Sequence, residues 1–226
     1  FGALVNEIGG LTGQTVLDFG CGWGGETAWL AQHAQQAMGC DIEPKSLETA
    51  KQFKEKQGLK NLNFALIKNN QIPFDDNTFD AVFSTNVFEH VMAPTVMLRE
   101  IRRVLKPGGR FLSTFGPLFY SPLGYHLCWV TQIPYAHLLF GFKPIMEVRN
   151  TKRTPLHATS WEETGLNRLT WGQFKNAVHD AGLHAHRLER IPVHGFKRLA
   201  ALPGVGNLFT FGIDCHLVKP NQPSVQ

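Results

Sequence analysis

The sequence predicts a doubly wound α/β fold, in which helices cover both faces of a mostly parallel sheet. The first observation is a short apolar segment, Thr15–Phe19, which is followed at once by a glycine-rich turn and a helical pattern over residues 26–34. The second is that apolar strands alternate with helical patterns as far as Phe115. The third is an aromatic segment, residues 116–169, which is longer than an ordinary loop and predicts a cap inserted after the fifth strand.

Composition limits the classes of protein to which the chain can belong. Its 226 residues are 43% hydrophobic, which suits a single globular domain over residues 1–226. A formal net charge of +4 without runs of like charge does not indicate a nucleic-acid partner. No apolar run approaches the roughly 18 residues that span a bilayer. Because the chain begins at Phe1 without a methionine, we expect that upstream residues have been lost or trimmed.

The cysteines predict reduced thiols rather than disulfides or a metal centre. Cys21, Cys40, Cys128 and Cys215 lie far apart, with no C-x-x-C spacing. Free thiols are typical of a cytoplasmic protein, which is the location we expect. No group of His, Cys and carboxylate residues has the spacing of metal ligands, so no metal is expected.

The glycine turn after the first strand fits two classes of ligand. Gly20, Gly22 and Gly25 satisfy G-x-G-x-x-G, the fingerprint of dinucleotide-binding proteins. Asp18, Gly20, Gly22 and Gly24 equally satisfy D-x-G-x-G-x-G, which resembles motif I of the class I S-adenosylmethionine-dependent methyltransferases. The Asp18 carboxylate suits a ligand that carries ammonium and sulfonium groups, whereas it would repel a pyrophosphate.

The next strand and helix support a ligand of the adenosine type. Gln36–Asp41 is the expected second strand, and Asp41 lies 21 positions after Gly20, where a carboxylate reaches ribose hydroxyls. Both classes of ligand use such a residue, so Asp41 does not choose between them. A helix is expected over residues 44–57 and a third strand over residues 62–67.

Three further motifs make the resemblance specific. Residues 72–80, IPFDDNTFD, resemble the LPF-x-D-x-S-F-D signature of the large methyltransferase family that includes the ubiquinone and menaquinone enzymes. Residues 87–91, VFEHV, resemble that family's v-l-e-H-v element, and residues 98–109, LREIRRVLKPGG, resemble its l-x-E-x-x-R-v-L-k-P-G-G element. With the glycine turn, four motifs follow one another in the family's order within residues 15–115.

The resemblance implies a seven-stranded, mostly parallel, Rossmann-like methyltransferase fold with the cap after strand five. Apolar periodicity and the Gly and Pro positions give the other elements. They are a first helix over residues 1–8, a fourth strand over Phe79–Thr85, a helix over 95–105, a turn over 107–109 and a fifth strand over 110–115. A helix over 171–181 follows, and Thr170 and Gln173 have the spacing of a capping box that opens it. The chain then has a sixth strand over 183–193, an excursion over 194–209, a last, antiparallel strand over Thr210–Val218, and an unstructured tail from Pro220.

The resemblance also implies which residues hold S-adenosyl-L-methionine. At the position where the family usually carries Gly-Asp-Ala, this chain has two asparagines, which puts that one adenine contact in doubt. The residues expected at the cofactor are Asp18, Gly20, Cys21, Gly22 and Gly24 for the methionine half, Asp41 and Ile42 for the ribose side, Asn69 and Asn70 near the adenine, and Asn86 under the methionine or the acceptor.

The cap supplies candidates for a general base toward an oxygen or nitrogen acceptor. His126 is the first candidate, with Tyr125 beside it, and His90 and His137 follow. The aromatic cap itself has three interpretations: a pocket for an apolar or ring-bearing acceptor, a separate core or dimer surface, or a peripheral contact with a membrane.

The sequence therefore predicts methyl transfer from S-adenosylmethionine to a small-molecule or lipid-like acceptor. Two alternatives remain. A non-catalytic S-adenosylmethionine-binding protein would share every motif. An NAD-dependent oxidoreductase would share the glycines and Asp41, but Asp18 and the Leu-Lys-Pro-Gly-Gly segment argue against it.

Overall fold

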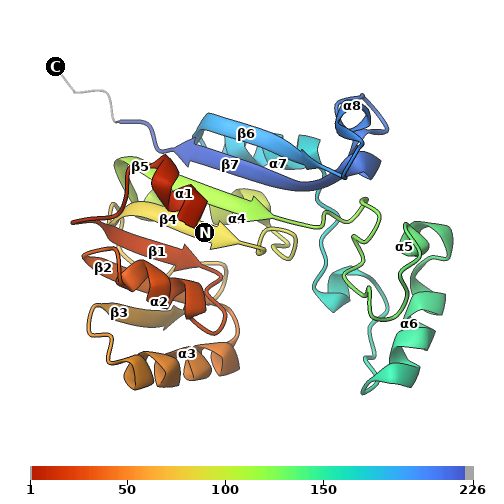
Figure 1. The fold of residues 1–226 in the computed structure, drawn as a ribbon, viewed down its shortest axis with the longest axis horizontal. Helices are drawn as coiled ribbons and strands as arrows, with labels where there is room; N and C mark the ends of the chain where they lie inside the picture. Colours follow the sequence, from red (N-terminus) through yellow and green to blue (C-terminus); the bar gives the residue numbers. More distant parts are fainter. Residues whose placement is uncertain (1, 222–226) are drawn as a thin grey trace.

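A computed structural model describes residues 2–221 and contains one seven-stranded sheet in the order β3-β2-β1-β4-β5-β7-β6 (Figure 1). The strands are parallel except that β7 runs antiparallel to both of its neighbours. The predicted doubly wound, mostly parallel sheet is confirmed. Its strands are β1 (Thr15–Phe19), β2 (Gln36–Asp41), β3 (Leu62–Leu66), β4 (Phe79–Thr85), β5 (Leu105–Phe115), β6 (His184–Pro192) and β7 (Thr210–Val218).

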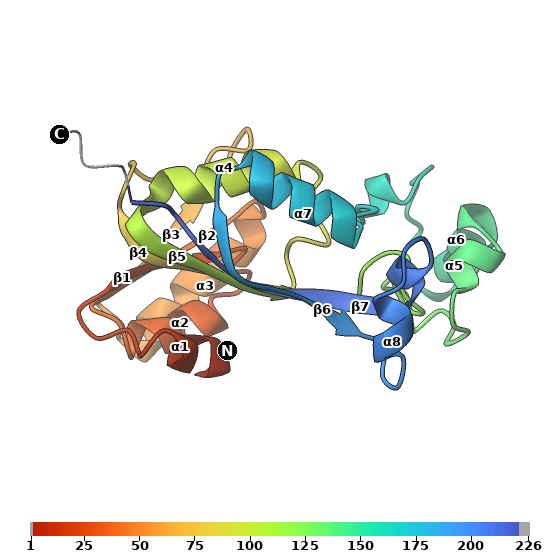
Figure 2. The ribbon, with the colours of Figure 1, turned by 90° about the horizontal axis from the view of Figure 1, so that it is seen from above.

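Helices cover both faces of the sheet, as Figure 2 shows. One face carries α1 (Gly2–Glu7), α2 (Gly25–Ala31) and α3 (Pro44–Gln57), and the other carries α4 (Pro94–Val104) and α7 (Trp171–Asp180). Neighbouring side chains of a strand enter opposite cores, because successive residues point to opposite faces. Thus Val16 is buried with α1 and α2, whereas Leu17 is buried with α4 and α7.

Local sequence signals explain where two of the helices begin and end. Pro44 is the first residue of α3, and Gly58, at φ 65°, ends it in the left-handed conformation that glycine tolerates. At α7, the Thr170 hydroxyl accepts a hydrogen bond from the backbone N–H of Gln173. In return, the side-chain oxygen of Gln173 accepts one from the backbone N–H of Thr170. This reciprocal capping box is the one that the sequence predicts.

Strand β5 begins five residues earlier than predicted. The predicted turn over residues 107–109 is part of the strand, because Leu105 pairs with Phe79 in the sheet. The Gly108 amide donates to the Lys219 carbonyl, and the Lys219 amide donates to the Gly109 carbonyl, both at 2.9 Å. The extended pairing places the Lys106 ammonium 2.7 Å from the Asp80 carboxylate.

Residues 116–169 leave the sheet after β5 and lie beyond the carboxyl ends of β1, β4 and β5 (Figure 1). They contain α5 (Ala136–Leu139), α6 (Phe142–Lys152) and the short helix η1 (Glu162–Thr164). Phe119, Tyr125, Ile145 and Trp161 form a small core of their own there. The smaller excursion between β6 and β7 contains α8 (Lys197–Ala200) and η2 (Gly206–Phe209).

The prediction for the first helix differs from the structure, and two predicted segments lie partly outside the described residues. Helix α1 is shorter than predicted, and the predicted helical residue Phe1 and the tail over residues 222–226 lie outside the described part. Among residues 2–221, no helix combines the length and the apolar character needed to cross a bilayer.

The capping box gives a stability prediction. The Thr170→Ala substitution leaves the Gln173 amide without its acceptor, so we expect the free energy of unfolding to fall by roughly 0.5–2 kcal/mol in urea denaturation. Thr49→Ala is the matched control, because the Thr49 hydroxyl donates to the Lys45 carbonyl inside α3 and caps nothing. An equal loss of stability in both variants would contradict the capping role.

Candidate functional site

A cavity of about 370 Å³ opens at the carboxyl ends of the strands, where the chain order of the sheet reverses between β1 and β4. Doubly wound folds bind ligands at this position, because the loops after the two strands diverge there. The wall consists of Phe19, Gly20, Asp41, Ile42, Ile67, Asn70, Asn86, Val87, His90, Val91, Met92 and Met97.

The glycine turn is shaped by close packing as well as by the cavity. A Cβ on Gly20 would lie 2.3 Å from Val87 Cγ2, and a Cβ on Gly24 would lie 2.7 Å from Phe64 Cζ. No atom lies within 4 Å of the position of a Cβ on Gly22. Gly20 and Gly24 therefore allow the turn to pack against its neighbours, whereas Gly22 leaves open space beside the cavity.

Asp41 is held in place at the end of β2. Its Oδ2 atom accepts from the Gly22 amide at 2.9 Å, and its Oδ1 atom accepts from the Glu43 amide at 2.8 Å. A carboxylate has about four acceptor positions, so both oxygens can still accept from a diol in the cavity. The structure thus gives Asp41 the fixed orientation that the predicted ribose contact requires.

Asp18 is buried at the end of β1, below the glycine turn. Its Oδ2 atom accepts from the Thr27 hydroxyl at 2.7 Å. Burial raises the pKa of Asp18 to about 7, and the nearby carboxylates of Glu26 and Asp41 add to the rise. Glu26 in turn accepts a short hydrogen bond from the Thr85 hydroxyl. Three carboxyl groups around one turn favour a cationic ligand.

The asparagines adopt backbone conformations that few other residues tolerate. Asn69, Asn70 and Asn86 have φ angles of 53°, 56° and 53°, in the left-handed region. Asn69 and Asn70 are the central residues of a tight turn closed by the Gln71 amide and the Lys68 carbonyl at 2.9 Å. Asn70 and Asn86 line the cavity, whereas Asn69 lies beside it in the turn.

His90 lines the cavity, and its tautomer is set by the protein. The Nδ1 atom donates to the Gly165 carbonyl at 2.8 Å, so the Nε2 atom carries the lone pair of the neutral ring. The centres of the His126 and His90 rings lie 5.1 Å apart. The Nε2 atom of His126 donates to the Pro117 carbonyl at 2.8 Å. Burial lowers the pKa of His126, which keeps that ring neutral.

The structure does not bring every predicted base to the cavity. Tyr125 is fully buried in the core of residues 116–169, and its hydroxyl donates to the Thr131 carbonyl at 2.6 Å. The predicted place of Tyr125 beside the acceptor is therefore not supported, because its proton is used inside that core. His137 is buried in the same core and contacts the Phe119 carbonyl.

Two polar residues at this site were not assigned a role from the sequence. Glu89 is buried, burial raises its pKa to about 7, and no described group forms a hydrogen bond with its Oε2 atom. It lies inside the VFEHV motif, which was the available signal. Asn167 carried no signal, because its role depends on a contact with residues almost 80 positions away.

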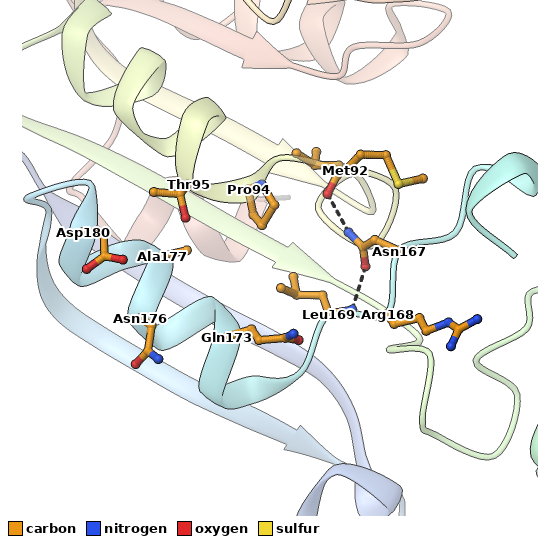
Figure 3. Close-up of a pocket in the computed structure, with 11 residues that line it drawn as sticks. Met92, Pro94, Thr95, Asn167, Arg168, Leu169, Gln173, Asn176, Ala177 and Asp180 are labelled. Carbon is orange, nitrogen blue, oxygen red and sulfur yellow. Dashed lines mark hydrogen bonds between the residues drawn. The ribbon is translucent and has the colours of Figure 1, made fainter.

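Asn167 fixes the loop that carries His90. Its Nδ2 atom donates to the Phe88 carbonyl at 2.6 Å. The same atom donates to the Val91 carbonyl at 2.8 Å, and the Oδ1 atom accepts from the Leu169 backbone amide at 3.0 Å (Figure 3). The pocket in Figure 3, of about 360 Å³, lies between this loop, the start of α4 and α7. The glycine turn and Asp41 do not line it, whereas Gly20 and Asp41 line the cavity described above.

The sequence is similar to those of known methyltransferases. Residues 17–113 match the family described as "Methyltransferase domain". The chain is 38% identical to 24-methylenesterol C-methyltransferase 3 of Arabidopsis thaliana over 103 residues, which are 45% of this chain and 29% of that enzyme. It is 29% identical to the ubiquinone biosynthesis O-methyltransferase of Coxiella burnetii over 182 residues, which are 79% of this chain and 70% of that enzyme. The match thus spans less than a third of the sterol enzyme.

Solved structures share the fold. A SAM-dependent methyltransferase from Aquifex aeolicus matches with a TM-score of 0.60 at 20% identity, over 96% of this chain and 88% of that one. A geranyl diphosphate methyltransferase in complex with GPP and sinefungin matches with a TM-score of 0.64 at 16% identity, over 96% of this chain and 77% of that one. The segment that matches the family, residues 17–113, contains every residue of the cavity wall.

The clamp formed by Asn167 gives a prediction. Asn167→Leu leaves two carbonyls of the His90 loop without their donor, so we expect the free energy of unfolding to fall by roughly 1–3 kcal/mol in chemical denaturation. Asn176→Leu, at an exposed position of α7 on the same pocket, is the control and should change stability little. If the two variants lose the same stability, Asn167 does not clamp the loop.

Proposed function

We propose that the chain is a class I S-adenosylmethionine-dependent methyltransferase that transfers the methyl group of S-adenosylmethionine to a small-molecule or lipid-like acceptor. The observation that carries this proposal is the Asp41 carboxylate, which is tied to the Gly22 amide and faces the cavity at the point where the sheet reverses. The relatives support the class of acceptor, since the name of one specifies a 24-methylenesterol and that of the other specifies ubiquinone biosynthesis.

The residues around the cavity fit this cofactor. When bound, S-adenosylmethionine supplies a methyl group already activated by a sulfonium. Asp18 and Glu26 place negative charge where an ammonium group is to be held, and Asp41 offers acceptors for a ribose diol. The open space at Gly22 gives the ligand access to the backbone of the turn. Cys21, Gly24, Ile42 and Asn69 complete the proposed binding residues.

We propose His90 as the base that faces the acceptor. Its Nδ1 proton is held by the Gly165 carbonyl, so its Nε2 lone pair is free to take a proton from a hydroxyl or amine. His126 is the weaker candidate of the pair, because its Nε2 atom is bound to the Pro117 carbonyl and it does not line the cavity. The apolar wall of Phe19, Val87 and Met97 excludes water from the reaction.

We also propose a role for residues 116–169, a cellular location and a contact with a membrane. Residues 116–169 act as a cap and acceptor-binding region of a single domain over residues 1–226, supported by their position beyond the strand ends and their separate core. A cytoplasmic location is supported by the four unpaired cysteines. Contact of the cap with a membrane is supported by its exposed apolar side chains.

A non-catalytic cofactor-binding protein is the main alternative, since it needs the same cavity. Incubation with methyl-labelled S-adenosylmethionine and a panel of phenols, quinols and sterols separates the two. Transfer of label, lowered at least about tenfold by His90→Gln, is the result expected of an enzyme with a general base. Cofactor binding without transfer to any acceptor of the panel would favour the binding protein.

The ribose contact gives a prediction for binding. Asp41→Ala removes the two carboxylate oxygens that are proposed to accept hydrogen bonds from the ribose. We therefore expect the Kd for S-adenosylhomocysteine, measured by calorimetry, to rise roughly tenfold to a hundredfold. Asp75→Ala, which removes an exposed carboxylate away from the cavity, should leave the Kd unchanged. Tight binding of NADH together with no response to S-adenosylhomocysteine would contradict the proposal and favour an oxidoreductase.

The raised pKa of Asp18 gives a pH dependence. A ligand ammonium binds the ionised carboxylate, and the pKa of this group in the free protein is about 7. The affinity for S-adenosylhomocysteine should therefore be full above pH 7 and fall by up to about tenfold per unit as the pH drops below it.

Two isosteric variants identify the carboxyl group whose ionisation causes this pH dependence of binding. Asp18→Asn should flatten this pH profile. Glu89→Gln should preserve it, although the pKa of Glu89 is also raised to about 7, because Glu89 accepts from the Gly116 amide and is not one of the carboxylates around the glycine turn. If the pH profile is unchanged in Asp18→Asn and flat in Glu89→Gln, then Glu89 is the group that titrates, and the assignment to Asp18 is wrong.

A further inference from the structure

The end of the molecule that carries α5, α6 and α8 exposes large apolar side chains from two separate segments. Leu139 is 68% exposed and Phe140 is 54% exposed at the end of α5, with Ile133 and Leu138 beside them in the sequence. Phe196, Leu202 and Val205 are exposed in the excursion around α8. Both segments lie at the same end of the ribbon in Figures 1 and 2.

The cap segment also contains an apolar groove of about 240 Å³. Its walls come from the chain before α5, which contributes Val130, from Phe140 just after α5, and from α6, which contributes Pro144 and Val148. Phe140 and Val148 belong both to the groove and to the exposed set. An exposed apolar surface continuous with a groove indicates a binding face rather than scattered surface residues.

Two cationic side chains lie beside this groove, next to Val130. The Lys152 ammonium donates to the Val130 carbonyl at 3.0 Å, and the Arg153 guanidinium lies 4.3 Å from the centre of the Trp129 ring. Residues 133–156 and 194–209 together carry six Lys and Arg against one carboxylate, Glu147. The rest of the chain carries 16 Lys and Arg against 17 Asp and Glu, so the positive charge of the protein is concentrated at this end.

We infer that this end of the protein docks on an anionic phospholipid bilayer. Leu139, Phe140 and the groove enter the boundary between headgroups and acyl chains, and Lys143, Lys152 and Arg153 face the lipid phosphates. Charge complementarity favours this partner over a second copy of the chain, because two copies would bring the same cations together. The inference does not depend on methyl transfer, but it would bring a lipid-like acceptor to the side of the molecule on which the cavity opens.

Cosedimentation with large vesicles tests the inference. The unaltered protein should bind vesicles of phosphatidylcholine with about one third phosphatidylserine, and bind them at least about fivefold more tightly than vesicles of phosphatidylcholine alone. The double variant Leu139→Ser, Phe140→Ser should bind at least about tenfold more weakly, and Lys143→Glu should lose most of the preference for the anionic lipid.

Matched variants elsewhere on the surface serve as controls. Phe53→Ser and Lys51→Glu, both at exposed positions of α3, make the same chemical changes away from this end and should leave vesicle binding unchanged. Unchanged binding of S-adenosylhomocysteine by every variant shows that the fold is intact, and it separates failure of this inference from failure of the proposed function.

Three results would overturn the inference. The first is no binding to either kind of vesicle. The second is equal binding to the two kinds, with no effect of the double variant. The third is a dimer by light scattering that the double variant dissociates, without vesicle binding, which would assign the surface to a second copy of the chain.

Discussion

The close contact between Gly20, in the glycine turn, and Val87, in the loop after β4, is the constraint on which the site depends. Only a residue without a side chain fits at Gly20, because a Cβ there would overlap Val87. This contact draws together the loops that leave β1 and β4, and these loops carry the proposed cofactor and acceptor residues. The Asp41 carboxylate then fixes the same turn from β2 through the Gly22 amide. Shape and charge of the cavity are therefore set by the same few contacts.

The electrostatics of the cavity divide it into two parts. The carboxyl groups of Asp18, Glu26 and Asp41 gather around the turn, where burial keeps the first of them close to half-protonated at neutral pH. A cationic ligand relieves this crowding, so binding and ionisation of Asp18 favour one another. On the other side, His90 is held by the Gly165 carbonyl, and its loop is held by Asn167. The segment that closes the cap thus also orients the proposed base.

The sequence predicted those features that depend on neighbouring residues. The last strand matches Thr210–Val218, and the capping box at Thr170 is formed as expected, since both follow from local periodicity and side-chain chemistry. Features that depend on distant contacts were missed. The early start of β5 needs Phe79 as the partner of Leu105, and the clamp by Asn167 needs the His90 loop. Tyr125 looked available in the sequence, but its neighbours in space form a core around it.

A crystal structure of the protein with S-adenosylhomocysteine bound is the most direct test of the central claim, which is that the cavity between β1 and β4 is the cofactor site. If this claim holds, the ribose hydroxyls lie within hydrogen-bond distance of the Asp41 carboxylate, and the amino group lies next to Asp18 and Glu26. Density for the ligand in the pocket between α4 and α7 instead, or a ribose that does not contact Asp41, would contradict it.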